Sequence, residues 1–268
     1  MINLQICFPI SKRSITIFII VTITLILIPY IILTHILTSN ESEALDIPDS
    51  FLENYLITDL INKETEAKEI INKYKDKKVI ALTFDDGPSK YTEKLLDTLK
   101  EKDVKATFFL LGYKIENRID TVKRMSDEGH NIGIHGYTHK LFTKLTEEEI
   151  NYEIETSRDI LENIIKDKVE LIRVPYGATN TLTNEAIEKH ELTSILWNID
   201  SKDWKLKNCK KVTKRVVSAA KDKKIILMHD TYLPSVNAAS EIIDELKKED
   251  FCFVTIKELL ILKNAEQT

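Results

Sequence analysis

Short apolar runs and amphipathic segments alternate along the chain from Val79 onward. The apolar runs have the length and composition of buried strands, and they occupy residues 79–84, 106–112, 131–136, 170–174, 192–199, 224–229 and 252–256. Segments of helical period separate them, at residues 92–103, 116–129, 146–166, 183–191, 209–222 and 239–250. This alternation predicts a parallel sheet covered by helices, and an open doubly wound sheet and a (β/α) barrel both satisfy it.

Polar side chains at the ends of the predicted strands favour the barrel. Five strands end in residues that suit catalysis or metal binding: Asp85 and Asp86, His135 and His139, Arg173, Asp200, and His229 with Asp230. The carboxyl ends of barrel strands meet at one rim, where barrel enzymes build their sites. We therefore expect a distorted (β/α) barrel of about seven parallel strands in residues 78–268. The chain has neither a Gly-x-Gly-x-x-Gly motif nor a Walker loop, so no nucleotide partner is expected.

The segment 15–37 is apolar and contains no Asp, Glu, Lys or Arg, and it is long enough to cross a bilayer as a helix. Lys12 and Arg13 precede it and acidic residues follow it. The positive-inside rule therefore predicts cytoplasmic residues 1–14 and an extracytoplasmic domain on a single-pass membrane anchor. A cleaved signal peptide is the rival interpretation, but its apolar core is usually shorter and no Ala-x-Ala site is present. Residues 38–77 then form a polar, partly helical stalk.

The charge balance argues against a nucleic-acid partner. The formal net charge of the 268 residues is −5 at pH 7. The first 40 residues contain two basic groups and no acidic one, which leaves the remainder at −7. Proteins that bind nucleic acid carry an excess of clustered Lys and Arg, which this total does not show.

The motif His135-Gly-Tyr-Thr-His139 indicates a metal site. Two histidines four residues apart at a strand end can be brought together by a single turn of chain. A carboxylate from the strand end at Asp85 or Asp86 completes a two-histidine, one-carboxylate set, which leaves positions open for water and substrate. The spacing alone does not decide which of the two aspartates is the ligand.

Two adjacent carboxylates suit a division of labour. Neighbouring side chains on a strand point to opposite faces, so we expect Asp85 and Asp86 to point to opposite sides and to have separate tasks. One can bind the metal while the other accepts a proton. His229 suits the role of the acid, with Asp200 as the partner that raises the pKa of its ring. Arg173 suits a bidentate contact that orients the free carboxylate.

These residues fall in five blocks whose order resembles the polysaccharide deacetylases of the NodB homology type, carbohydrate esterase family 4. The blocks are TFDDGP at 83–88, HGYTH at 135–139, RVPYG at 173–177, DSKDW at 200–204 and LMH at 227–229. The resemblance covers nearly all of residues 78–262. One departure is Gly136, where the family usually has Ser or Thr, so we expect the residues that support the metal ligands to differ while ligation itself is kept.

The resemblance implies a role for each matching residue. Asp85 is expected to be the general base held by Arg173, and His229 the general acid tuned by Asp200. Asp86, His135 and His139 are expected to bind a divalent metal, zinc being the usual one, with Co²⁺, Mn²⁺ or Ni²⁺ as alternatives. The expected oxyanion donor is the backbone N–H of Tyr176. The residues expected to line the acetyl pocket are Trp204, Leu227 and Pro175.

The resemblance also implies the reaction, which is hydrolysis of an acetyl group on a sugar polymer with release of acetate. Together with the predicted outward orientation, it favours an N-deacetylase of peptidoglycan amino sugars. Two alternatives stay open: a deacetylase of another glycan, such as a chitin oligomer, xylan or a capsule polymer, and a catalytically silent carbohydrate-binding module.

Overall fold

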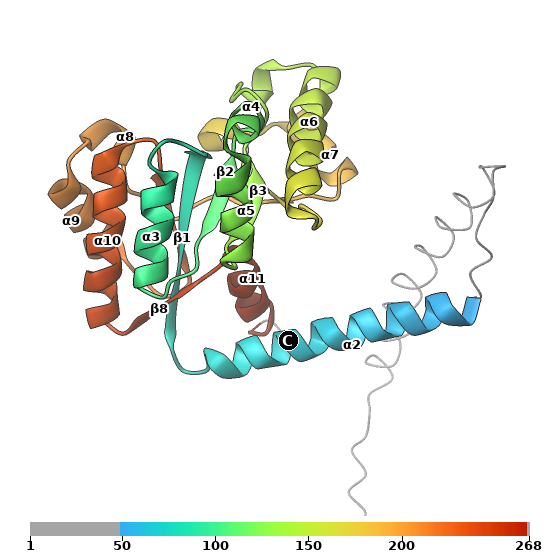
Figure 1. Cartoon of the computed structure of the whole chain (residues 1–268), viewed down its shortest axis with the longest axis horizontal. Helices are drawn as coiled ribbons and strands as arrows, with labels where there is room; N and C mark the ends of the chain where they lie inside the picture. Colours follow the sequence, from blue (N-terminus) through green and yellow to red (C-terminus); the bar gives the residue numbers. More distant parts are fainter. Residues whose placement is uncertain (1–48, 267–268) are drawn as a thin grey trace, which may run out of the picture. The chain divides into compact units, whose positions relative to one another are not determined.

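The computed structural model describes residues 49–266 (Figure 1). The chain divides into two units, one ending at Glu66 and one beginning at Ala67, and the boundary lies inside helix α2 (Asp49–Lys73). This helix confirms that the predicted stalk at 38–77 is partly helical. No helix among residues 49–266 is long and apolar enough to cross a membrane, and the span predicted at 15–37 lies outside the described residues. The second unit contains every predicted site residue and is described below by itself.

The second unit is built on a sheet in which every strand pairing is parallel. Its strands are β1 (Lys78–Gly87), β2 (Thr107–Leu110), β3 (Asn131–Ile134), β4 (Leu171–Ile172), β5 (Thr193–Ser194), β6 (Ile199–Asp200), β7 (Lys224–His229) and β8 (Phe251–Val254). They follow the order β5-β4-β3-β2-β1-β7-β6, and β8 pairs with the first half of β1. The parallel α/β prediction is confirmed. Closure is incomplete, because β5 and β6 end the path and do not pair within the described residues.

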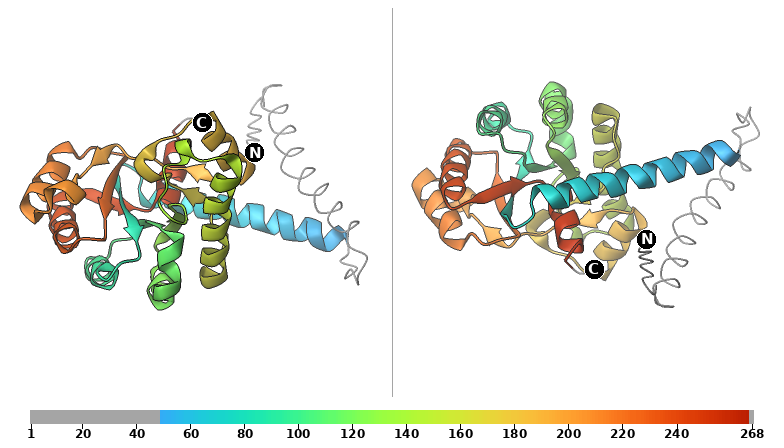
Figure 2. Two further views of the ribbon diagram at one scale, coloured as in Figure 1. Left: turned by 90° about the horizontal axis from the view of Figure 1, so that it is seen from above. Right: turned by 90° about the horizontal axis from the view of Figure 1, so that it is seen from below.

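Helices pack against both faces of this sheet (Figure 2), because the C-terminal helix shares a buried cluster with Val79 and Ala81 whereas most of the others share one with Ile80, Leu82 and Phe84. They are α3 (Thr92–Glu101), α4 (Gly112–Ile115), α5 (Ile119–Asp127), α6 (Glu147–Ile165), α7 (Thr181–Lys189), α8 (Asp203–Leu206), α9 (Cys209–Ala219), α10 (Leu233–Lys248) and α11 (Ile256–Asn264). Contacts join them in the spatial order α9, α10, α3, α5, α6 and α7. Helix α6 begins at a capping box, in which the Thr146 hydroxyl accepts from the Glu149 N–H and the Glu149 carboxylate accepts from the Thr146 N–H.

The central strand β1 is buried on both faces, as expected of a parallel sheet. Ile80, Leu82 and Phe84 belong to the larger apolar cluster, which lies beneath the helices, and Val79 and Ala81 belong to a second cluster. Side chains alternate along a strand, so Thr83 and Asp85 lie on the same face of the sheet as Val79 and Ala81. The strand therefore carries a hydroxyl and a carboxylate into the interior at its carboxyl end.

The run predicted as one strand at 192–199 is two strands at opposite ends of the sheet. Thr193 and Ser194 pair with β4, whereas Ile199 and Asp200 pair with β7. Residues 195–198 connect the two edges, and Arg173 holds this connection because its guanidinium donates to the carbonyl oxygens of Ile195 (3.0 Å) and Leu196 (3.4 Å). Periodicity did not reveal the break, because the connecting residues are as apolar as a strand.

Candidate active site and metal centre

Asp85 and Arg173 form a buried ion pair at the centre of the site. The guanidinium Nη1 lies 2.7 Å from Oδ1 of Asp85, and the side chains are 0% and 4% exposed. The same nitrogen donates to the Thr83 hydroxyl at 2.8 Å, and the guanidinium lies 4.2 Å from the ring centre of Phe109. Burial lowers the pKa of Arg173, while the charge and the hydrogen bond of Asp85 oppose this shift. The predicted pairing of these two residues is present, but the bidentate geometry is not, because Nε and Nη2 donate to the carbonyl oxygens of Ile195 and Leu196. The single short bond orients the Asp85 carboxylate.

The expectation that Asp85 and Asp86 point to opposite sides is wrong. The pairing of β1 with β2 shifts between Asp85 and Gly87, and Asp86 has a left-handed backbone with φ of 69°. This bulge re-aims the Asp86 side chain toward His135, which Asp85 also faces. Lys114 donates to the Asp86 carbonyl oxygen at 2.8 Å. Gly87 is required beside the bulge, since a Cβ there would lie 2.6 Å from the buried carboxylate of Asp230.

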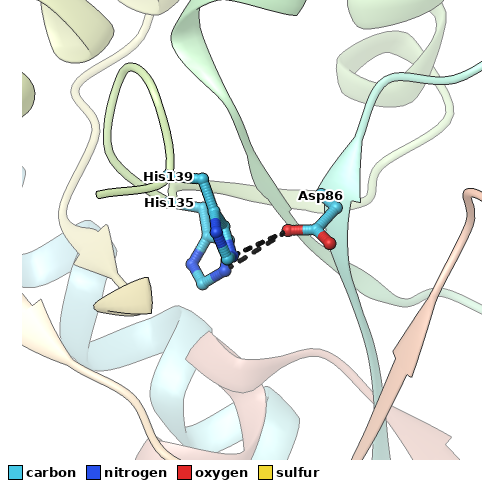
Figure 3. Close-up of side chains that lie close together, drawn as sticks. All are labelled: Asp86, His135 and His139. Carbon is cyan, nitrogen blue, oxygen red and sulfur yellow. Dashed lines mark ion pairs between the residues drawn. The ribbon is translucent and has the colours of Figure 1, made fainter. Parts of the chain in front are cut away.

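Asp86, His135 and His139 converge as the metal-site prediction requires (Figure 3). Oδ1 of Asp86 lies 3.6 Å from Nε2 of His135 and 3.3 Å from Nε2 of His139. Ligand distances of about 2.0–2.1 Å in tetrahedral geometry place donor atoms about 3.3–3.4 Å apart. The three side chains therefore have nearly the spacing of one metal coordination sphere.

Two further observations fit a bound cation. Oδ1 of Asp86 is buried and has no hydrogen-bond donor among the described residues, which is costly for a carboxylate unless a cation neutralises it. Nδ1 of His135 lies 2.5 Å from the Arg173 carbonyl oxygen. That contact makes Nδ1 the protonated nitrogen and leaves Nε2 as the free donor that a metal needs. Burial also lowers the pKa of His135, which favours the neutral ring.

Glu153 of α6 holds the loop between the two histidines, and the sequence motifs did not identify it. Its Oε2 accepts from the N–H groups of Tyr137 and Thr138, both at 2.7 Å, and its Oε1 accepts from the Thr138 hydroxyl. Glu153 is 1% exposed, so these donors replace its hydration. Gly136 has φ of +77°, and a Cβ there would lie 3.1 Å from Oε2 of Glu153. Glycine at 136, where the family usually has Ser or Thr, therefore suits a left-handed backbone that packs closely against the buried Glu153 carboxylate.

His229 lies beside Asp85, because these residues are paired in register on β7 and β1. Its partner is Asp203, and the predicted pairing with Asp200 is wrong. Nδ1 of His229 lies 2.8 Å from Oδ1 of Asp203, and the His229 N–H donates to Oδ2 at 2.7 Å. Burial lowers the pKa of His229, but the hydrogen bond and charge of Asp203, with the charges of Asp85 and Asp86, outweigh it and raise the pKa to about 9.

Asp200 has a different position from the one predicted for it. Its carboxylate accepts from the Lys202 N–H at 2.8 Å, and its carbonyl oxygen accepts from Nε of Arg215 at 2.7 Å. Asp200 and Asp203 belong to the same motif, and their spacing in the sequence does not show which of them contacts His229. The chain turns after Asp200, because Lys202 is left-handed with φ of 53°, and the turn brings the buried Asp203 under the imidazole.

The remaining predicted residues differ in exposure. Tyr176 is left-handed with φ of 63°, is 65% exposed, and has its ring centre 4.7 Å from that of His139. Pro175 is buried beside it in the turn Pro175–Gly177. Trp204 is 49% exposed and directly follows Asp203, whereas Leu227 is 5% exposed in β7. The structure thus places Tyr176 next to a candidate metal ligand and Trp204 next to the partner of His229.

The chain is similar in sequence to known polysaccharide deacetylases. A family model described as polysaccharide deacetylase matches residues 72–195. The chain is 38% identical to the peptidoglycan-N-acetylmuramic acid deacetylase PdaC of Bacillus subtilis, over 72% of this chain and 41% of that protein. It is 37% identical to the putative polysaccharide deacetylase YheN of the same organism, over 76% and 74% of the two chains. It is 39% identical to the peptidoglycan-N-acetylglucosamine deacetylase PgdA of Listeria monocytogenes, over 70% of this chain and 40% of that protein.

The solved structure of PdaC matches with a TM-score of 0.68, covering 72% of this chain and 94% of that one. The chain belongs to the polysaccharide deacetylase family, whose members are hydrolases, and this confirms the family predicted from the five motifs. It spans about two fifths of the length of PdaC and of PgdA.

Glu153 provides a test of the loop geometry. We expect Glu153→Ala to weaken zinc binding about 10-fold to 100-fold, because the loop that presents both histidines loses its buried acceptor. Competition with a chromogenic zinc chelator measures this affinity. Asp159→Ala, at an exposed position of the same helix, is the matched control and should bind zinc as the wild type does. Equal affinity in both variants would contradict the role given to Glu153.

The partner of His229 is tested by titration of the metal-free protein. NMR should give His229 a pKa near 9 in the wild type and in Asp200→Asn. In Asp203→Asn the value should fall below 6.5, because burial then dominates. A raised pKa stabilises the fold below the unfolded value of 6.5, and that contribution is lost as pH rises through about 9. The free energy of unfolding should therefore fall over this range in the wild type, and less in Asp203→Asn.

Proposed function

We propose that this protein hydrolyses N-acetyl groups of an extracytoplasmic glycan, with peptidoglycan amino sugars as the substrate. The observation that carries the proposal is the Asp85 carboxylate, paired with Arg173, between the candidate cation site and His229, whose ring is held by Asp203. A base, an acid and a cation site on one rim are the groups that amide hydrolysis needs. The names of PdaC and PgdA support the substrate, since they specify N-acetylmuramic acid and N-acetylglucosamine of peptidoglycan.

The side chains divide the proton transfers between them. Asp85 accepts a proton from the attacking water, and Arg173 keeps its carboxylate aimed at that water. His229 carries its proton at neutral pH and gives it to the departing amine, while Asp203 holds the ring. The backbone N–H of Tyr176 donates to the oxygen on which negative charge develops. Trp204, Leu227 and Pro175 surround the acetyl methyl group.

The cofactor proposed for the site is a divalent metal, with zinc first and Co²⁺, Mn²⁺ or Ni²⁺ as alternatives. Asp86, His135 and His139 would hold it, and one carboxylate with two imidazoles is a set that suits Zn²⁺. When bound, it supplies a Lewis acid that polarises the acetyl carbonyl and lowers the pKa of water.

The proposed location is the outer face of the cell membrane. It rests on the apolar segment 15–37 and the charges that flank it. Deacetylation of chitin oligomers, xylan or a capsule polymer is the alternative within the same chemistry. A silent carbohydrate-binding module is disfavoured, because the base, the acid and the three candidate ligands are all present in one site.

Acetate release tests the reaction and the roles of the two aspartates. The full chain should release acetate from peptidoglycan faster than from chitin oligomers or acetylated xylan, and a chelator should abolish release. Asp85→Asn should lower the turnover rate by a factor of at least about 10² and still bind one zinc ion. Asp86→Asn should lose the metal. Zinc loss in Asp85→Asn, or undiminished release after chelation, would contradict this assignment.

A further inference from the structure

The segment that follows β6 is strongly basic, although the chain as a whole is acidic. Residues 202–224 contain ten Lys or Arg and two Asp, against a formal net charge of −5 for all 268 residues. The segment comprises α8, α9 and the first residue of β7. The total charge therefore conceals a local excess, and the proposed reaction uses none of these cations.

Eight of the ten cations are exposed: Lys202, Lys205, Lys207, Lys210, Lys211, Lys214, Arg215 and Lys221. Within residues 49–266, no acidic side chain forms an ion pair with any of these eight. Unpaired cations on one surface repel each other and attract a polyanion. Lys210, Lys214 and Lys248 border a hollow with Glu241, Asp244 and Glu245 of α10, so three cations face three carboxylates there. Lys214 also lines the groove described next.

The other side of α9 forms a groove with β6, and its volume is about 460 Å³. The polar residues that line it are Asn198, Asp200, Lys211, Lys214, Arg215 and Ser218. The carboxylate of Asp200 accepts from the Lys202 N–H, so it is engaged in the turn. The groove therefore presents three cations, one carboxylate and two neutral polar side chains, so the cations are in excess. This combination suits carboxylate or phosphate groups.

Asp200 connects this groove to the active site. Its carbonyl oxygen accepts from Arg215, and its carboxylate accepts from Lys202. Three residues further along, Asp203 holds His229, and Trp204 is exposed next to it. The turn 200–203 thus belongs to both sites, and α8 lies at the same end of the sheet as the tip of β1 (Figure 1).

We propose that the groove between β6 and α9 binds anionic groups carried by the substrate polymer, so that the substrate is an anionic acetylated glycan. This inference rests on the proposed function, because it takes His229 as the place where the glycan reacts. A polymer chain is favoured over a lipid surface, since Asp200, which lines the groove, belongs to the same turn as Asp203, the partner of His229. Carboxylates and phosphates share the chemistry that recognises the groove.

Binding of labelled peptidoglycan strands to the full chain tests the proposal without catalysis. One sample keeps its stem-peptide carboxylates, and a matched sample has them converted to neutral methyl amides. Fluorescence anisotropy should show about tenfold tighter binding of the anionic strands at low salt, and the difference should vanish at high salt. The double variant Lys211→Gln/Lys214→Gln should lose the preference. The control Lys75→Gln/Lys77→Gln removes two exposed cations before β1 and should keep it.

The results that would overturn the groove proposal differ from the result that would overturn the proposed function. Equal binding of the two strand samples, or an unchanged preference in Lys211→Gln/Lys214→Gln, would overturn the proposal. Binding to phosphatidylglycerol vesicles that needs Lys211 and Lys214, without a preference between the strands, would overturn it in favour of a membrane surface. If the preference behaves as expected but no acetate is released from either sample, the groove stands and the proposed function fails.

Discussion

The site depends on a buried guanidinium that joins four parts of the fold. Arg173 follows β4, and its side chain binds Thr83 and Asp85 of β1 and the connection between β5 and β6. Its carbonyl oxygen accepts from His135, so the same residue orients the base and a candidate metal ligand. A buried charge that loses its partner costs about 3–5 kcal/mol, so the ion pair constrains both residues. Assignment of the two aspartates follows from this pairing, since Asp85 is engaged and Asp86 is not.

The backbone is left-handed at three residues of the candidate site. Asp86, His139 and Tyr176 have φ between 63° and 69°. Non-glycine residues adopt this conformation at a cost of about 1–3 kcal/mol each, and such residues cluster where function requires them. At Asp86 it rotates a carboxylate into the cation site. Lys114 supports that bulge, and Glu153 supports the loop that ends at His139.

Most of the architecture and the ligand set could be predicted from the sequence, because apolar runs and motif order carry them. The run at 192–199 misled, since Ile195, Leu196 and Trp197 of the connection are apolar like a strand, although only Ile195 is buried. The prediction that Asp200 pairs with His229 is wrong because two aspartates three residues apart fit the same motif. The left-handed turn at Lys202, which the sequence does not reveal, brings Asp203 to His229 instead. Glu153 was missed because it lies on a helix, where a buried carboxylate resembles a solvated one in sequence.

A crystal structure of the zinc-loaded protein with acetate is the most direct test of the central claim, which is that Arg173 commits Asp85 to proton transfer and leaves Asp86 to the metal. We expect one zinc ion bound by Asp86, His135 and His139, with the Asp85 carboxylate still paired with Arg173 and facing the acetate. Zinc bound through Asp85, or Arg173 displaced from that carboxylate, would contradict this account.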